Sequence, residues 1–225
     1  MIIPVGDVTP RKTVPFFNYL LILANVVVFF SYFFRPDAEV IRIHDVYALH
    51  PVRWDVLSVF TSMFMHADPL HLFGNMLFLW IAGDNVEDRI GHLPYLLFYF
   101  VCGAAGAAAH ILTARGAMAD APTVGASGAI SGILGAYLVF FPASKIKFAL
   151  WLVIFVRFFT LPSWGAIALW VGSQLLMARN QLNGVTKGET AAVAVFAHLG
   201  GFLFGVAAAV LLRLLGQAKP GPKKD

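Results

Sequence analysis

The chain has 225 residues, of which 59% are hydrophobic and only 12% carry a charged side chain, and its mean hydropathy is +0.77. Soluble domains contain about 25% charged residues, so this composition excludes a soluble globular fold and predicts a polytopic membrane protein. The net charge of +4 is typical of membrane proteins with basic cytoplasmic segments, and we expect no nucleic-acid partner. The single cysteine, Cys102, excludes an intramolecular disulfide and a cysteine-based metal cluster.

The first apolar run, residues 16–34, is too long for the core of a signal peptide, and no small-residue cleavage site follows it. We therefore expect it to be a retained transmembrane helix. Because about 20 apolar residues cross the hydrocarbon core of a bilayer, the uncharged runs predict six spans. These are residues 16–34, 69–83 (running on toward Val86), 93–112, 121–144, 158–178 and 190–212.

The ambiguous stretch is 146–160, where Lys147 and Arg157 bracket only nine uncharged residues. We expect a loop or an interfacial segment there, with the fifth span beginning near Leu161, and the alternative is a seventh span. With six spans and a cytoplasmic N-terminus, cytoplasmic segments hold ten Lys and Arg and external segments hold six, whereas a seventh span would place the basic C-terminal tail outside. The sequence therefore predicts an all-α six-helix bundle over residues 16–213, with cytoplasmic tails at 1–15 and 214–225.

Polar side chains inside the spans are costly in lipid and are therefore functional candidates. The six runs contain no Asp or Glu, and the candidates are His71 and Asn75 in span two, His110 in span three, Ser127 and Ser131 in span four, and His198 in span six.

Ser127 opens span four within the sequence Gly125-Ala-Ser127-Gly128. Glycine neighbours permit close backbone approach, and a helix N-terminus favours the negative charge that a nucleophilic serine generates. The alternative is a small-residue packing motif. His198 is a candidate general base, the alternative being a packed histidine bonded to a carbonyl group. In the six-span topology both residues lie in the outer half of inward-running spans, where glycines allow the helices to approach: Gly125, Gly128, Gly201 and Gly205.

His71 and Asn75 are four residues apart and share one face of span two. A histidine and an asparagine aimed at one point can donate hydrogen bonds to an oxyanion. The alternative is a polar contact between helices. We interpret His66, in the preceding loop, as a loop-bracing residue and His110 as structural.

The chain resembles the rhomboid family of intramembrane serine proteases over roughly residues 54–205. The similarity rests on four motifs in order: residues 64–75 (FMHADPLHLFGN), 83–91 (GDNVEDRIG), 125–128 (GASG) and 197–201 (AHLGG). The resemblance implies Ser127 as nucleophile and His198 as general base, in a dyad without a carboxylate. It also implies an oxyanion site formed by His71, Asn75 and the Ser127 backbone N–H. His66, Glu87, Gly125, Gly128 and Gly201 are the supporting residues.

Two positions differ from many members of the family. The first external loop reads Asp55-Val-Leu57-Ser58 where a Trp-Arg pair is common, and Arg53-Trp54 stands a few residues earlier. Ser131 occupies the position, four residues after the nucleophile, where many members carry an aromatic residue that packs on the histidine.

The resemblance implies that the chain cleaves transmembrane segments of other membrane proteins within the bilayer. We expect a multi-pass protein of a prokaryotic cell (inner) membrane that needs no cofactor or metal and retains activity in EDTA. One alternative is a non-catalytic rhomboid-like protein that binds membrane clients, and the retention of Ser127 and His198 disfavours it. The other is a transporter with a histidine proton relay, and the lack of intramembrane acids and of half-repeats disfavours it.

Overall fold

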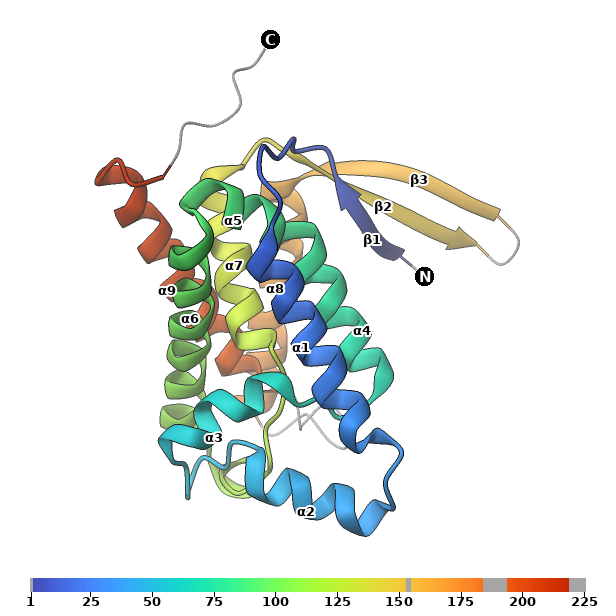
Figure 1. Ribbon diagram of the computed structural model, residues 1–225, viewed down its shortest axis with the longest axis vertical. Helices are drawn as coiled ribbons and strands as arrows, with labels where there is room; N and C mark the ends of the chain where they lie inside the picture. The colour runs from blue at the N-terminus through green and yellow to red at the C-terminus, as the bar shows by residue number, and fades with distance from the viewer. Residues whose placement is uncertain (1, 153–154, 184–193, 219–225) are drawn as a thin grey trace.

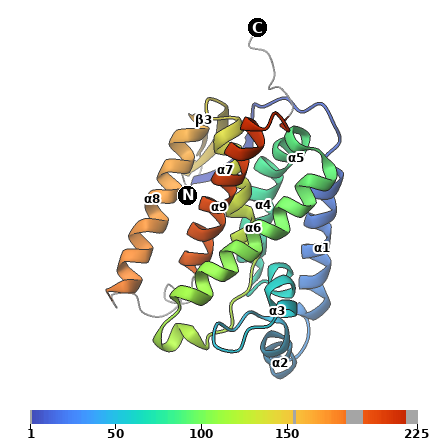
Figure 2. The same ribbon diagram turned by 90° about the vertical axis from the view of Figure 1, so that its left-hand side faces the viewer.

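The computed structural model describes residues 2–152, 155–183 and 194–218, and most of them are helical (Figure 1). The long helical segments lie side by side as a bundle (Figures 1 and 2). They are α1 (Phe16–Phe33), α4 (Pro69–Phe78), which continues through the π-helical turn η2 (Leu79–Gly83) into α5 (Asp84–Ile90), α6 (His92–Thr113), α7 (Ser127–Phe140), α8 (Ser163–Leu182) and α9 (Val195–Leu214).

Shorter helices cover one end of this bundle, opposite the end that carries α5 and the C-terminal end of α9 (Figure 1). They are α2 (Asp37–Tyr47), α3 (Val56–Thr61) and the 3-10 turns η1 (Ser62–Phe64) and η3 (Gly116–Ala119). The N-terminal ends of α7 and α9 point toward this covered end, so the motifs around Ser127 and His198 enter the bundle from the same side.

The centre of the bundle is α7, which packs closely against α9 through glycine. A Cβ atom on Gly201 would lie 2.0 Å from the carbonyl oxygen of Gly128, and one on Gly205 would lie 2.1 Å from that of Gly132. Real Cβ contacts are never so short, so these positions require glycine while the two backbones are this close. Gly128, Gly201 and Gly205 thus lie at the close contact between the two helices, as expected from the sequence, and Gly132 joins them. Gly125, expected to act in the same way, lies instead against His71 and Asn75 of α4.

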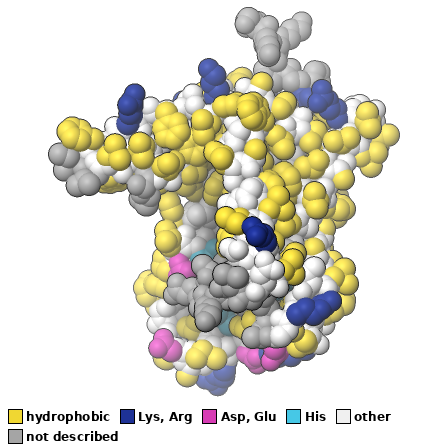
Figure 3. Space-filling model, turned by 180° about the vertical axis from the view of Figure 1, so that it is seen from behind, with side chains coloured by type: hydrophobic (Ala, Val, Ile, Leu, Met, Phe, Trp, Pro, Cys, Tyr) yellow, Lys and Arg dark blue, Asp and Glu magenta, His cyan; other side chains and the backbone are white. Residues whose placement is uncertain are grey.

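Three of the described helices are long and apolar enough to cross a membrane: α1, α6 and α9. Hydrophobic side chains also cover much of the face of the molecule that Figure 3 shows. These features are those of an integral membrane protein. The other helices do not meet the same length and hydropathy criteria, so the count of six spans stays a prediction.

The all-α prediction is wrong for one part of the chain, because a three-stranded antiparallel sheet projects from the end of the bundle (Figure 1). Its order is β1 (Ile2–Asp7), β2 (Lys145–Leu152) and β3 (Phe155–Pro162). β2 and β3 pair from Lys145↔Pro162 to Leu152↔Phe155, and β1 pairs with β2 from Ile2↔Leu150, with an irregularity between Pro4 and Gly6.

The described residues of the stretch 146–160 are thus strand, so the expectation of a loop is wrong and they form no seventh helix. The interfacial position stays a prediction. The stretch is rich in aromatic and β-branched residues, which favour strands over helices. β1 lies within residues 1–15, so part of the expected tail is ordered against this hairpin. Pro162 then ends the sheet and precedes the first residue of α8.

Candidate active site

Ser127 is the first residue of α7, and a turn built on Gly125 leads into it. Gly125 has a φ of +129°, a backbone conformation that favours glycine, and its N–H donates to the carbonyl oxygen of Ser62 over 2.9 Å. The Ser127 N–H lies in the first turn of the helix, where no carbonyl of a preceding turn can accept from it. The turn therefore presents the Ser127 hydroxyl and N–H together at a helix N-terminus.

The Ser127 hydroxyl forms a hydrogen bond with His198 of α9. The distance between Ser127 Oγ and His198 Nε2 is 2.7 Å, across 71 residues of sequence. Both side chains are partly exposed. The geometry is that of a serine paired with a general base.

His71 and Asn75 lie on the other side of the turn that precedes Ser127. Asp68 caps α4 and accepts from the His71 N–H over 2.8 Å, which fixes the first turn of that helix. A Cβ atom on Gly125 would lie 2.9 Å from His71 Nε2 and 3.5 Å from Asn75 Nδ2. The structure therefore brings both polar side chains against the turn that carries Ser127, and a side chain at Gly125 would displace them.

His66 connects this face of α4 to α1. Asn75 Nδ2 donates to His66 Nε2 over 2.9 Å, while the His66 backbone N–H and C=O both bond to the Tyr32 hydroxyl at 2.8 Å. Burial in the loop before α4 lowers the pKa of His66 to about 3, so its ring is neutral and can accept from the amide. His66 thus orients Asn75 as well as bracing the loop.

Glu87 lies away from these residues, in α5, with its side chain fully buried. Its two carboxylate oxygens accept from the backbone N–H groups of Phe17 at 3.0 Å and Asn18 at 2.7 Å, and one of them also bonds to His92. These N–H groups are in the first turn of α1, where a negative charge is favourable. Glu87 therefore fixes α1 to α5.

The two other predicted polar residues have structural contacts. His110 Nε2 bonds to Thr123 Oγ1 over 3.0 Å and ties the end of α6 to the segment before α7. Ser131 donates to the Ser127 carbonyl oxygen over 2.6 Å, so its hydroxyl is directed at the backbone of its own helix.

Two residues of α8 that contact His198 are missing from the sequence-based prediction. His198 Nδ1 bonds to Gln174 Oε1 over 2.7 Å, and the Trp170 ring lies 6.3 Å from the His198 ring, centroid to centroid. The rule that selected the other intramembrane polar residues also applies to Gln174, which lies within the uncharged run 158–178. Trp170 thus gives His198 an aromatic neighbour from α8, whereas the position on α7 where many family members carry the aromatic residue is Ser131.

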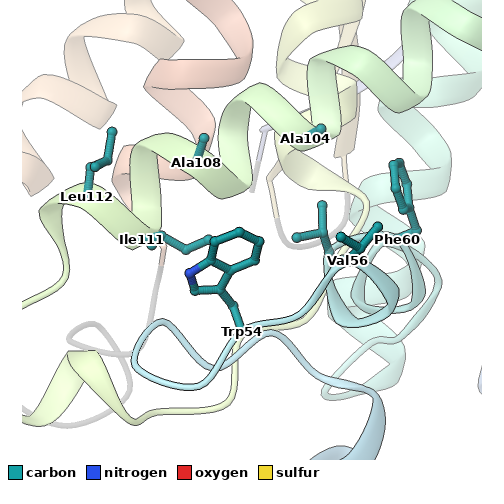
Figure 4. Close-up of a pocket in the computed structure, with 8 residues that line it drawn as sticks. Trp54, Val56, Phe60, Ala104, Ala108, Ile111 and Leu112 are labelled. Carbon is teal, nitrogen blue, oxygen red and sulfur yellow. The ribbon is translucent and has the colours of Figure 1, made fainter.

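Arg53 and Trp54 lie in the loop before α3 and do not reach the serine–histidine pair. Arg53 pairs with Asp45, and Trp54 lines an apolar hollow of about 380 Å³ between α3 and the end of α6 (Figure 4). In the part of the loop where many family members carry a Trp-Arg pair, Asp55 and Ser58 form a capping box for α3. The hollow contains none of the predicted site residues in its lining.

Metal coordination finds no support among the residues that the structure describes. Over these ranges no three His, Cys, Asp or Glu side chains gather closely enough to hold an ion. The polar groups around Ser127 are instead hydrogen-bond donors and acceptors: one hydroxyl, two imidazoles and two amides.

Comparisons with known proteins agree on one family. A family model described as Rhomboid domain matches residues 53–214. The chain is 33% identical over 153 residues to "Rhomboid protein 1, mitochondrial" of Saccharomyces cerevisiae, a match that covers 67% of this chain and 40% of that protein. It is 38% identical over 78 residues to "Rhomboid protease GluP" of Bacillus subtilis, covering 35% of this chain and 14% of that protein.

A further relative is the human "Presenilin-associated rhomboid-like protein, mitochondrial", 26% identical over 155 residues, with 64% of this chain and 35% of that protein covered. The matched region therefore spans 40% or less of each of these three relatives. Two of the relatives are mitochondrial by name, so the comparisons do not support the expected prokaryotic membrane.

Proposed function

The chain belongs to the rhomboid family, and we propose that it is an intramembrane serine endopeptidase whose nucleophile is Ser127 and whose general base is His198. The observation that carries the proposal is the 2.7 Å hydrogen bond between Ser127 Oγ and His198 Nε2. The partial exposure of both side chains supports access of a peptide and of water to the pair.

The proposed reaction begins when Ser127 Oγ attacks the carbonyl carbon of a peptide bond. His198 Nε2 takes the hydroxyl proton during attack and returns it to the leaving amine. Water then hydrolyses the acyl-enzyme, with His198 again acting as base. No carboxylate is needed to position the proton, because the histidine is held by a neutral amide on its other nitrogen.

The oxyanion of the tetrahedral intermediate is stabilised, in this proposal, by the Ser127 N–H and by His71 and Asn75. The Ser127 N–H is free of intrahelical acceptors because it opens α7, and the α7 N-terminus favours negative charge. His71 and Asn75 contribute side-chain donors from α4, directly across the Gly125 turn.

We further propose that the chain crosses the membrane six times with both termini in the cytoplasm. The substrates are then transmembrane segments that enter near the outer leaflet, and the family resemblance favours small residues at the cut and a helix that unwinds easily. The bundle and its apolar surface support a bilayer environment.

The test is cleavage of a model transmembrane substrate by purified protein in lipid vesicles. Ser127→Ala should abolish cleavage and labelling by a fluorophosphonate probe while the protein stays folded, because only one hydroxyl is removed. Ser131→Ala is the matched control on the same helix and should retain most of the activity, because the Ser131 hydroxyl contacts only the helix backbone. Cleavage by Ser127→Ala at the parental rate would refute the assignment. A parental protein that binds but neither cleaves nor labels would favour the non-catalytic alternative.

A further inference from the structure

The nitrogen of His198 that does not face Ser127 has a partner on a third helix. Gln174 is buried on α8, and its Oε1 lies 2.7 Å from His198 Nδ1. Trp170, one turn earlier on the same face of α8, packs against the same imidazole ring. Figure 2 shows α8 at the edge of the bundle, beside α9.

Which amide atom faces His198 decides which ring nitrogen carries the proton, and Ser173 fixes the amide. The Ser173 hydroxyl donates its only proton to the Trp170 carbonyl oxygen over 2.6 Å. Ser173 Oγ can then only accept, so the Gln174 atom that lies 3.2 Å away must be the NH₂ group. The Gln174 carbonyl oxygen therefore faces His198.

The carbonyl oxygen has no proton, so His198 Nδ1 must donate to it. A neutral imidazole with a proton on Nδ1 carries a free lone pair on Nε2, and this is the atom that meets the Ser127 hydroxyl. The opposite tautomer would place a proton between His198 and Ser127 and leave no base. We infer that Gln174 is a positioning residue that holds His198 in the tautomer able to accept the Ser127 proton; this inference rests on the proposed serine protease function.

An amide suits this task in a membrane. In soluble serine proteases a buried aspartate orients the histidine, but a carboxylate among the spans would be costly to remove from water. Gln174 supplies the acceptor without a net charge, and its oxygen strengthens the hydrogen bond as the imidazole becomes positive in the transition state. The glutamine therefore explains how His198 can be oriented although the predicted spans contain no Asp or Glu.

The experiment compares Gln174→Met, Gln174→Glu and the control Leu175→Ala, which lies one position along α8 and is exposed. Gln174→Met keeps the length of the side chain but removes the acceptor, and we expect fluorophosphonate labelling of Ser127 to fall by about 10- to 100-fold, the effect of losing one charge-assisted hydrogen bond. Gln174→Glu, in the neutral carboxylic-acid form that burial favours, retains a carbonyl acceptor oxygen, and its Ser127 should react with the probe within a few fold of the parental rate. Leu175→Ala should label normally, and the thermal unfolding of each variant is measured alongside.

Nitrogen-15 NMR of labelled histidine gives a readout that needs no activity, with the His198 signals assigned by their loss in His198→Ala. The parental protein should show a neutral ring protonated at Nδ1, and Gln174→Met should shift the population toward Nε2–H. Labelling of folded Gln174→Met at the parental rate, or a parental ring protonated at Nε2, would overturn the inference. If Gln174→Met does not fold, the inference is tested by the parental tautomer and by the fluorophosphonate labelling rate of Gln174→Glu. A parental ring protonated at Nε2 would overturn it, and so would loss of labelling in folded Gln174→Glu. If the parental protein fails to label at all, the proposed function fails, while the measured tautomer still tests Gln174.

Discussion

His71 and Asn75 both lie beside the Gly125 turn, yet they differ in their other partners. Asn75 donates one of its two amide protons to His66, which leaves the other for an oxyanion. His71 has its backbone N–H capped by Asp68 and its ring against the turn. Each would supply one hydrogen bond that strengthens only in the transition state, so each should affect rate more than binding.

These contacts predict an order of effects on labelling of Ser127 by a fluorophosphonate. His198→Ala should scarcely label, because loss of the general base disables proton transfer. Asn75→Ala should label more slowly than the parental protein but faster than His198→Ala, because the other donors remain. His71→Ala should fall between the two, since His71 also orders the start of α4. Initial labelling rates in detergent give the order, and parental behaviour of Asn75→Ala would assign its amide to helix packing alone.

At the scale of single residues, the sequence predicts the contact between Ser127 and His198 because motif spacing and depth in the spans both point to it. It does not predict the partner of the second His198 nitrogen. Gln174 carries no motif, and its role depends on how α8 is rotated against α9, which packing of apolar side chains decides. The sequence likewise does not predict that the Ser173 hydroxyl orients the Gln174 amide, because this contact depends on the side-chain rotamers of both residues.

At the scale of helices, close approach of α7 and α9 keeps Ser127 within reach of His198, and glycine is what permits it. Gly205 tests this packing away from the reacting groups, since its added Cβ would meet Gly132 O at 2.1 Å. Gly205→Ala should therefore destabilise the protein by about 1–3 kcal/mol through overpacking and weaken labelling of Ser127.

The matched control is Gly172→Ala on α8, where an added Cβ would meet no atom within 4 Å. Helix propensity favours alanine over glycine by about 1 kcal/mol, so this variant should be neutral or slightly stabilised. Thermal unfolding in the same detergent compares the two. Equal unfolding temperatures for both variants would show that the contact between α7 and α9 accommodates a methyl group at residue 205, which contradicts the close packing proposed for Gly205 and Gly132.

Glu87 holds a second junction, between α5 and α1. The buried Glu87 carboxylate accepts from the N–H groups of Phe17, which is partly buried, and Asn18, which is buried. Glu87→Ala should therefore cost about 2–4 kcal/mol of unfolding free energy, and Glu87→Gln, which keeps one acceptor oxygen, should cost less. Glu39→Ala is the control: its ion pair with Arg35 is exposed and should contribute less than about 1 kcal/mol. An effect of Glu87→Ala no larger than that of Glu39→Ala would contradict the capping role.

The sheet shows where element-level prediction fails. The aromatic and β-branched residues of 146–160 favour the local pairing of β2 with β3, a signal that is missed when the stretch is judged only by the length of its uncharged run. The third strand, β1, pairs with β2 from about 140 residues earlier in the chain, and local sequence carries no signal for a partner at that distance. The uncharged runs, by contrast, locate the long helices, although α7 and α8 begin five to six residues later than the runs 121–144 and 158–178, and no run corresponds to α2 or α3. The start of α4 is explained by Asp68 and Pro69, a capping residue followed by proline.

At the scale of the whole molecule, the two ends of the bundle differ in what they carry. The sheet, the start of α1 and the C-terminal end of α9 lie at one end, and α2, α3 and the starts of α7 and α9 lie at the other (Figures 1 and 2). The start of α1 and the C-terminal end of α9 lie at the same end of the bundle, which is the arrangement that the proposed even number of crossings requires. Basic residues near the sheet end include Arg11, Lys145 and Arg213, which favours that end as cytoplasmic.

This arrangement predicts where reporters will be found in cells. A reporter fused after Asp225 should be cytoplasmic, and one inserted between α8 and α9 should be external, because α9 begins at the end of the bundle that carries α2 and α3. A fusion before Met1 provides the control and should share the side of the C-terminal fusion. Protease protection of each fusion in sealed vesicles reads the side directly. An external C-terminus with a cytoplasmic N-terminus would require an odd number of crossings. It would contradict the proposed position of Ser127 and His198 near the outer leaflet, but it would not affect the hydrogen bond between them.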